Sequence, residues 1–255
     1  RFSIHSIRED RQGRLLVGGL GLLVMDGDRT SFYTSPESLA DNSVRAILAA
    51  SDGSVWIGTI SGVRRLTSLD GNPFAVPRIA TGINAGVLME SSDGRVWVGA
   101  YGDGVLVYEG GRLVRKLQAP SALPHNNVLA LSEDSERNIW VGTQGGLLRL
   151  SPSTAATLTT ADGVPQTIST IYEDRDGTLL ATALNGSIYR VWNGVLKPLP
   201  LPPGIGALRI RNAYRDSAGA LWLGTDGQGA LRITPAGVRR FTMRQGLVND
   251  FIRAF

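Results

Sequence analysis

A tryptophan-glycine frame recurs along this chain at nearly constant spacing. It reads SVWIGT at residues 54–59, and again RVWVGA at 95–100, NIWVGT at 138–143 and ALWLGT at 220–225. Leucine takes the tryptophan place in two further copies. The six anchor positions, separated by 40 to 43 residues, are Leu16, Trp56, Trp97, Trp140, Leu180 and Trp222. A period of this length held over six units indicates a repeat architecture.

Every repeat has the same internal order. An apolar, roughly alternating run such as ISTIYED comes first, followed by a turn such as DRDG, the anchor run, a glycine-containing turn and a third run. Segments of about five or six residues between such turns are typical of strands in hairpins. Four strands in about 42 residues predict a propeller blade. We therefore expect an all-β chain, a β-propeller of four-stranded antiparallel blades.

The repeats divide the whole chain into one propeller domain or a fragment of one. Their approximate bounds are 2–41, 42–82, 83–125, 126–166, 167–208 and 209–248, with the start of another repeat at 249–255. Residues 2–10 and 246–255 both resemble a first strand, and two copies of one strand cannot complete the same blade. The pattern predicts a piece of a longer protein whose ring has seven blades. The alternative is a six-bladed ring with residues 246–255 leading to the next domain.

The anchor run predicts a strand that is buried on both faces, because Val55, Trp56 and Ile57 are apolar in succession. A glycine follows two residues after each tryptophan anchor, where a neighbouring blade should approach the backbone closely. These glycines are Gly58, Gly99, Gly142 and Gly224. We interpret the tryptophans and glycines as structural anchors of the repeat.

The turn before each anchor has its own residue signature. An aspartate stands six residues before the anchor in four repeats, as Asp10, Asp134, Asp174 and Asp216. We expect its carboxylate to accept backbone N–H groups of the hairpin. Glycine stands three before the anchor in five repeats and supplies a positive φ. Arg137 breaks this rule, which predicts strain or a shifted turn there.

The composition argues against several kinds of chemistry. The chain has no cysteine and two histidines, so thiolate zinc sites, disulfides and a cysteine nucleophile are excluded. We expect no metal site, no cofactor and no catalytic residues. The net charge is +4, but no basic stripe is interleaved with aromatic residues, so we expect no nucleic-acid partner. No apolar run approaches the roughly 18 residues of a membrane span, so this chain should not itself contact a membrane.

The repeat pattern resembles that of the two-component regulator propeller family. Its best copy runs from Asn127-Val128 through Asp134 to Ile139–Thr143 and then Gly146-Leu147. The repeats anchored on Leu16 and Leu180 are the weakest copies. The resemblance implies an extracytoplasmic, periplasmic sensor region of a membrane-anchored signalling protein, such as a hybrid histidine kinase, with the output domain elsewhere. Many members are linked to sensing of polysaccharide fragments.

Binding is expected on one rim of the propeller channel, where the loops from all blades gather on a rigid scaffold. The turns at Tyr101–Gly104 and Asp226–Gly229 are one residue longer than the others. Amides, a tyrosine and a few charges suit an oligosaccharide or another small ligand, although entry asparagines can equally cap turns. The candidate ligand-binding residues are Tyr101, Asp103, His125, Asn126, Gln144, Asn185, Arg211, Asp226 and Gln228.

Three functions remain open at this stage. The first is a ligand-sensing or signal-input module that binds an oligosaccharide or a partner propeller. The second is a non-catalytic protein-interaction scaffold, with a homodimer through propeller faces as its simplest form. The third is a lyase or hydrolase, which would need Asp103, His125 and Asp226 to converge from different repeats.

Overall fold

The structure is a computed structural model, which describes residues 3–34, 43–70, 78–151, 155–158, 167–174, 176–192, 195–205 and 208–252. Within these residues, twenty-four strands form six four-stranded antiparallel sheets. Among the described residues the one helical element is a 3-10 turn at Met243–Gln245. The predicted all-β class and the four-stranded antiparallel blades are confirmed. The chain forms two compact units, Arg1–Val128 and Leu129–Phe255.

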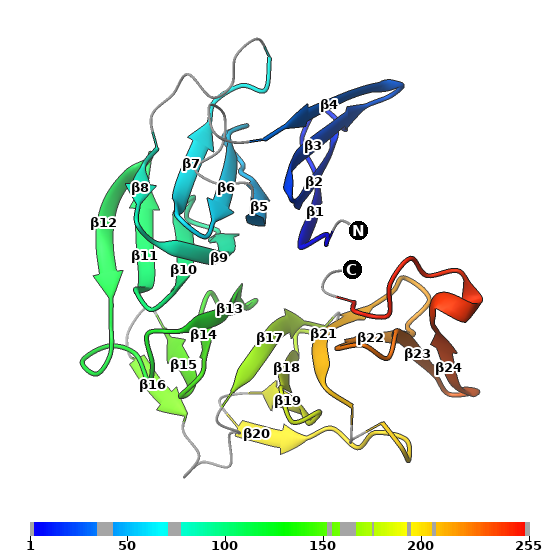
Figure 1. Cartoon of the computed structure of the whole chain (residues 1–255). Coiled ribbons are helices and arrows are strands. Elements are labelled where there is room, and N and C mark those ends of the chain that lie inside the picture. The colour runs from blue at the N-terminus through cyan, green and yellow to red at the C-terminus, as the bar shows by residue number, and fades with distance from the viewer. Residues whose placement is uncertain are drawn as a thin grey trace. The chain divides into compact units, whose positions relative to one another are not determined.

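The first unit contains three blades, and strands adjacent in the sequence pair with each other throughout (Figure 1). Blade 1 comprises β1 (Ser6–Glu9), β2 (Leu15–Gly19), β3 (Gly21–Asp26) and β4 (Arg29–Tyr33). Blade 2 comprises β5 (Val44–Ala49), β6 (Val55–Thr59), β7 (Gly62–Leu66) and β8 (Ala80–Thr81). Blade 3 comprises β9 (Asn84–Glu90), β10 (Val96–Tyr101), β11 (Gly104–Glu109) and β12 (Arg112–Leu117).

The second unit repeats this arrangement. Blade 4 comprises β13 (Val128–Glu133), β14 (Ile139–Thr143), β15 (Gly146–Leu150) and β16 (Ala155–Leu158). Blade 5 comprises β17 (Ile168–Glu173), β18 (Leu179–Ala183), β19 (Ile188–Trp192) and β20 (Val195–Pro198). Blade 6 comprises β21 (Ile210–Arg215), β22 (Leu221–Thr225), β23 (Ala230–Thr234) and β24 (Gly237–Phe241). The repeat bounds and the blade number of the parent ring stay predictions.

The second strand of each blade carries the core, as its apolar run predicts. Every residue of β6 is buried, with Trp56 only 2% exposed and Ile57 fully covered. The two faces of β6 serve different neighbours. Val55 and Ile57 join a cluster with Leu16 and Val44 between blades 1 and 2, whereas Trp56 joins the cluster between blades 2 and 3. β6 is thus sandwiched between two sheets, which is why it shows no polar alternation.

The same division holds in the second unit. Trp140 lies in a cluster with Ile168 and Leu179 between blades 4 and 5. Leu180 takes the tryptophan place in blade 5 and joins Ile210 and Leu221 between blades 5 and 6. Leucine therefore fills the anchor position with aliphatic packing alone.

The anchor glycines lie where the first strand of the next blade comes close to the backbone. A Cβ atom on Gly58 would lie 2.7 Å from the carbonyl oxygen of Ala85, and one on Gly142 would lie 2.9 Å from Ile168. On Gly99 it would meet Val87 at 2.4 Å and Val128 at 2.6 Å. Carbon atoms need about 3.5 Å, so these contacts leave room for hydrogen only.

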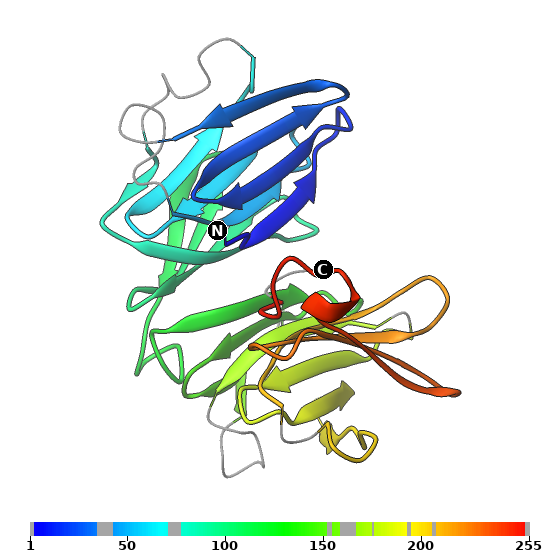
Figure 2. The same ribbon diagram turned by 45° about the vertical axis from the view of Figure 1, so that its right-hand side comes forward.

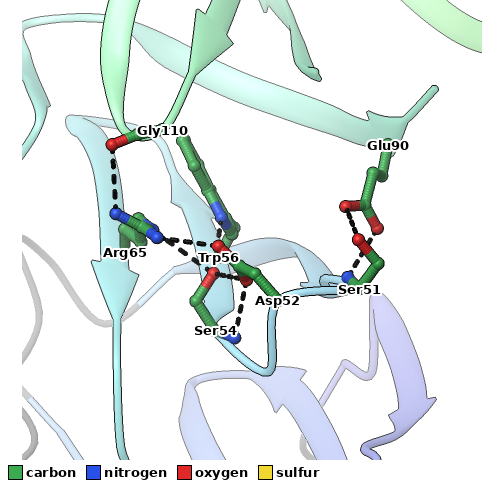
Figure 3. A network of polar contacts seen from close by, with 7 residues as sticks. All are labelled: Ser51, Asp52, Ser54, Trp56, Arg65, Glu90 and Gly110. Atoms are coloured by element: carbon green, nitrogen blue, oxygen red, sulfur yellow. Dashed lines mark hydrogen bonds and ion pairs between the residues drawn. The ribbon is translucent and has the colours of Figure 1, made fainter. Parts of the chain in front are cut away.

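Polar contacts also join adjacent blades at the end of the first strand. In Figure 3, Glu90 at the end of β9 accepts hydrogen bonds from the backbone N–H and hydroxyl of Ser51 in the blade 2 turn, at 2.7 and 2.5 Å. In the second unit the backbone N–H of Ser135 donates to Glu173 at 3.0 Å. Each bond fixes the turn of one blade onto the first strand of the next.

Candidate functional site

The turn between β10 and β11 places Tyr101 at the surface of the first unit, half exposed. Gly102 and Gly104 both have positive φ, and a Cβ on Gly104 would lie 2.1 Å from the carbonyl oxygen of Leu117. The two glycines donate their backbone N–H groups to one acceptor, the carbonyl oxygen of Asn126, at 3.2 and 3.0 Å. Tyr101 also forms a β-bridge with Asn127. The turn is therefore held rigidly against the segment that leads into β13.

The remaining predicted residues of this corner have their polar atoms engaged. The Asn126 side-chain oxygen accepts the backbone N–H of Ala119 at 2.7 Å, so Asn126 braces its own loop. His125 is exposed, and its Nδ1 accepts the backbone N–H of Asn127 at 3.0 Å. That bond places the proton of the neutral imidazole on Nε2. Asp103 pairs with the Lys116 ammonium at 3.4 Å.

The structure thus brings together four predicted residues at one corner of the first unit, which we call the blade 3 corner: Tyr101, Asp103, His125 and Asn126. Its outward groups are a phenol ring, an imidazole Nε2 and a carboxylate–ammonium pair. This arrangement offers one aromatic face beside hydrogen-bond donors and acceptors, which is a chemistry that can bind a polyhydroxy ligand.

A second corner of the same design lies in the second unit, between β22 and β23. Arg211 forms an ion pair with Asp226 at 2.6 Å, in which the aspartate side chain is only 15% exposed. The backbone N–H of Gln228 donates to the Thr225 hydroxyl at 3.0 Å. Gln228 itself is exposed at the surface. We call Arg211, Asp226 and Gln228 the blade 6 corner.

The other two predicted residues lie in turns of their own. Gln144 is half-buried in the tight turn after β14. Asn185 is exposed after β18, and its side-chain oxygen accepts the backbone N–H of Ser187 at 3.0 Å, so it caps its turn.

The register corrects one expectation about turn length. Leu180 pairs with Arg190, ten positions on, as Trp97 pairs with Val107. Trp140, in contrast, pairs with Arg149, nine positions on. The blade 5 turn is therefore as long as those of blades 3 and 6, so three turns rather than two are extended. The sequence comparison missed it because this turn lacks the usual glycine pattern.

The turn aspartates have the predicted structural role. Oδ1 of Asp134 accepts the backbone N–H groups of Glu136 and Asn138 at 3.0 and 2.8 Å, and Asp216 does the same for Ala218 and Ala220. Arg137 has φ 63°, which confirms the predicted strain where glycine is missing.

Sequence reasoning missed the second partner of these aspartates. Oδ2 of Asp134 accepts the indole N–H of Trp140 at 2.7 Å, and Oδ2 of Asp216 accepts that of Trp222 at 2.8 Å. Blade 2 has alanine in the aspartate place, and there Ser54 accepts the Trp56 N–H at 3.1 Å while donating to Asp52 (Figure 3). The constant six-residue spacing of aspartate and tryptophan is the signal that could have revealed the pair.

Arginine takes over the donor role where the tryptophan is absent. In blade 1, Arg14 Nε donates to Asp10 at 2.7 Å. In blade 5, Arg215 Nε donates to both oxygens of Asp174 at 2.8 Å, from β21 of the next blade. All four turn aspartates are therefore matched by a strong N–H donor, and two of them, Asp10 and Asp174, are buried.

Two turn aspartates of the second unit have a lowered pKa. The hydrogen bond from Trp222, together with the N–H groups of Ala220 and Ala218, holds the pKa of Asp216 below its ordinary value of 3.8. The Thr178 hydroxyl does the same to the pKa of Asp176. The lowered pKa values reflect the hydrogen bonds of the turns.

The described residues contain neither a metal-ligand cluster nor a membrane-spanning helix. No cluster of three or more histidine, aspartate or glutamate side chains is placed to hold a metal ion in the part of the chain that the structure describes. In that same part, no helix has the length and apolarity needed to cross a membrane.

Comparison with known proteins confirms the repeat family. The family model of the two component regulator propeller matches residues 38–61 and 122–145, so the chain carries repeats of this class. No curated protein matches the chain significantly.

Solved structures show the same fold at low identity. The extracellular domain of the putative hybrid two-component system BT4673 from B. thetaiotaomicron superposes with a TM-score of 0.77 at 18% identity, over 98% of this chain and 35% of that one. Virginiamycin B lyase from Staphylococcus aureus gives a TM-score of 0.73 at 14% identity, over 93% and 83%. PorZ from Porphyromonas gingivalis gives 0.71 at 14%, over 98% and 43%. The fold is thus a β-propeller, and the chain spans about a third of the length of the BT4673 domain.

Proposed function

We propose that the chain is a non-catalytic, extracytoplasmic sensor propeller of a membrane-anchored two-component-type signalling protein, located in the periplasm. The match of two repeats to the two component regulator propeller model carries this proposal. The similarity to the extracellular domain of a putative hybrid two-component system supports it. In this role the chain binds a signal and passes a shift to an output domain elsewhere in the parent protein.

The proposed binding surface is the blade 3 corner, with an oligosaccharide as ligand. The exposed Tyr101 ring offers an apolar face for a sugar ring. Asp103 and the Nε2–H of His125 can bind hydroxyl groups beside it. The turn is rigid because two glycine N–H groups converge on one carbonyl oxygen, so little ordering entropy is lost on binding.

A thermal-shift screen against neutral and acidic bacterial and plant oligosaccharides tests the proposal. A ligand at 100 times its Kd should stabilise the chain by about 2.7 kcal/mol. Tyr101→Ala should abolish the shift, whereas Leu113→Ala, at a similarly exposed position on β12, should not. No shift across the panel, or a shift that survives Tyr101→Ala, would contradict the blade 3 corner as the site.

The lyase alternative is the weaker one in this chain. Nδ1 of His125 is occupied by a backbone N–H and Asp103 is paired with Lys116, so neither group is poised as a base next to the other. The direct check is incubation of the purified chain with virginiamycin B. Turnover above background that is lost in His125→Ala would show that the propeller is an enzyme.

An interaction scaffold is the second candidate, with a partner propeller or a second copy as the bound protein. A specific observation favours it: several exposed apolar side chains gather on one face of blade 1.

A further inference from the structure

An exposed aromatic side chain lies beside the blade 6 corner. Phe251 is 52% exposed and forms a β-bridge with Asp226, the first residue of the turn between β22 and β23. A Cβ on Gly227 would lie 3.1 Å from the tip of the Phe251 ring, so the ring packs against the bare backbone of the turn. Figure 2 shows the segment after β24, drawn in red, beside the orange strands of blade 6.

The backbone around Phe251 is held firmly although its ring is exposed. The carbonyl oxygen of Asp250 accepts the Gly229 N–H at 2.7 Å, and the Ile252 N–H donates to the carbonyl oxygen of Thr225 at 3.0 Å. Hydrogen bonds thus fix the residues on both sides of the ring to blade 6. An aromatic ring presented on such a backbone has little conformational freedom to lose when a ligand binds.

A β-bulge positions the cation of this corner. The pairing of β21 with β22 shifts between Ile210 and Asn212, so Arg211 stands in the bulge. Bulges re-aim side chains and are frequent next to active sites. Here the Arg211 guanidinium reaches the Asp226 carboxylate at 2.6 Å. A guanidinium carries five N–H donors, so Arg211 can bind hydroxyl groups of a ligand in addition to Asp226.

The blade 3 corner is built on the same backbone template. Tyr101 forms a β-bridge with Asn127 at the start of its turn. Asp226 takes the place of the tyrosine in blade 6, and its bridge partner is the aromatic Phe251. Positive φ values between 75° and 97° are shared by the turn glycines Gly102, Gly104, Gly227 and Gly229. Each corner therefore presents one exposed aromatic ring and one carboxylate–cation pair on a rigid turn, with the ring on opposite sides of the bridge.

We propose that the blade 6 corner together with Phe251 is a second saccharide site, so that each of the two units carries one. The apolar face of a pyranose ring packs on Phe251, and its hydroxyl groups bind the exposed Gln228 amide and the Arg211 guanidinium. Each site is complete within its own unit. The ligand class is the oligosaccharide proposed for the blade 3 corner, and in this respect the inference rests on the proposed function.

The test observes both corners in one isotope-labelled sample of the chain by NMR. The probes are the neutral and acidic oligosaccharides of the thermal-shift panel, each added in excess. Backbone N–H signals of Gly227 and Gly229 report on the blade 6 corner, and those of Gly102 and Gly104 report on the blade 3 corner. At least one probe should shift both pairs of signals.

Substitutions then separate the two sites. Phe251→Ala should weaken the Kd measured at the blade 6 glycines by roughly tenfold or more, because it removes the stacking surface, and should leave the blade 3 glycines unchanged. Tyr101→Ala should do the reverse. Val248→Ala is the matched control, since Val248 is 95% exposed in the same segment but lies outside the corner, and it should alter neither Kd.

The outcomes distinguish this inference from the proposed function. Shifts confined to the blade 3 glycines overturn the second site and leave the proposed function standing. Shifts confined to the blade 6 glycines, lost in Phe251→Ala, support the second site and contradict the blade 3 corner as the binding surface. Shifts in neither pair overturn both. Blade 6 shifts that appear on raising the chain concentration without a probe also overturn the second site, because Phe251 would then contact a second copy.

Discussion

At the residue scale, the chain meets one requirement in three ways: a carboxylate or hydroxyl in the first turn needs a strong N–H donor. The tryptophan indole donates to the turn aspartate in blades 4 and 6, and to the hydroxyl of Ser54 in blade 2. Arginine supplies the donor in blades 1 and 5. A buried donor or acceptor left alone costs about 1 to 3 kcal/mol, which explains why the chemistry varies while the pairing persists.

A double-mutant cycle on Asp134 and Trp140 tests this account. Asp134→Ala should destabilise the chain by about 3 kcal/mol, because it leaves the indole N–H and two backbone N–H groups without their acceptor. In a Trp140→Phe background the same change should cost about 1 kcal/mol less, since no indole N–H remains to be orphaned. Urea unfolding of the wild type, the two single variants and the double variant gives the coupling free energy between Asp134 and Trp140. Strict additivity would mean that the bond contributes nothing.

The pH dependence of Asp216 follows from the same bond. Its folded-state pKa is lowered below 3.8, so its contribution to stability is present above that value. The contribution should disappear as pH falls through the folded pKa. The Tm difference between the wild type and Asp216→Asn should therefore shrink from about pH 5 to about pH 2.

Trp222→Phe provides the control for that titration, since it removes the hydrogen bond that lowers the Asp216 pKa most. In this background the Asp216→Asn difference should already be smaller at pH 5. A wild-type difference that stays constant with pH would show that Asp216 is not stabilised in its charged form.

Residue identity alone predicted part of this network. The aspartates were assigned to their turns correctly, because turn aspartates act locally. Their indole partners were not predicted, because the bond depends on how β14 or β22 folds back beside the turn. Arg215 was even less accessible, since it reaches Asp174 from 41 residues away on another blade.

At the element scale, the approach of first strands to the anchor glycines controls how blades pack. Gly99→Ala should destabilise the chain by about 1 to 3 kcal/mol, because its Cβ would overlap Val87 and Val128 at 2.4 and 2.6 Å. Gly86→Ala on the neighbouring strand is the matched control, since its Cβ would meet no atom within 4 Å. Equal costs for the two substitutions, measured by urea unfolding, would contradict the packing argument.

The blade 5 to blade 6 contact makes a second prediction. Arg215→Ala should cost about 2 kcal/mol or more, because it leaves the Asp174 carboxylate, 5% exposed, without its cation. Arg190→Ala in blade 5 should cost less than about 1 kcal/mol, because the side chains of its ion pair with Asp176 are 45% and 55% exposed. A larger loss for Arg190→Ala in thermal or urea unfolding would reverse this ranking.

Strand order and the buried second strands were predictable because they follow from local alternation and turn residues. The blade 3 and blade 6 corners were predictable only as places where loops gather. Their polar contacts depend on backbone geometry that single residues do not encode. The extended blade 5 turn was missed for the same reason, since only the pairing of Leu180 with Arg190 reveals it.

At the scale of the whole molecule, stability is expected to be distributed by position within each blade. The second strands β6, β10 and β14 are buried along nearly their whole length, whereas the fourth strands β4, β12 and β24 are largely exposed. In repeat proteins the contacts of each element are confined to its neighbours, so protection should follow local burial.

Hydrogen exchange followed by mass spectrometry should therefore show the slowest amides in β6, β10 and β14 and the fastest strand amides in β4, β12 and β24. Blade 1 should depart from this ranking in residues 1–255, because Leu15 on β2 is 38% exposed whereas Val55 at the same place on β6 is 3% exposed. We expect β2 to exchange faster than β6 by an order of magnitude or more, since an uncovered face lowers the local opening free energy. Equal protection of β2 and β6 would mean that the exposed face of β2 around Leu15 is already covered in solution, and would direct attention to self-association.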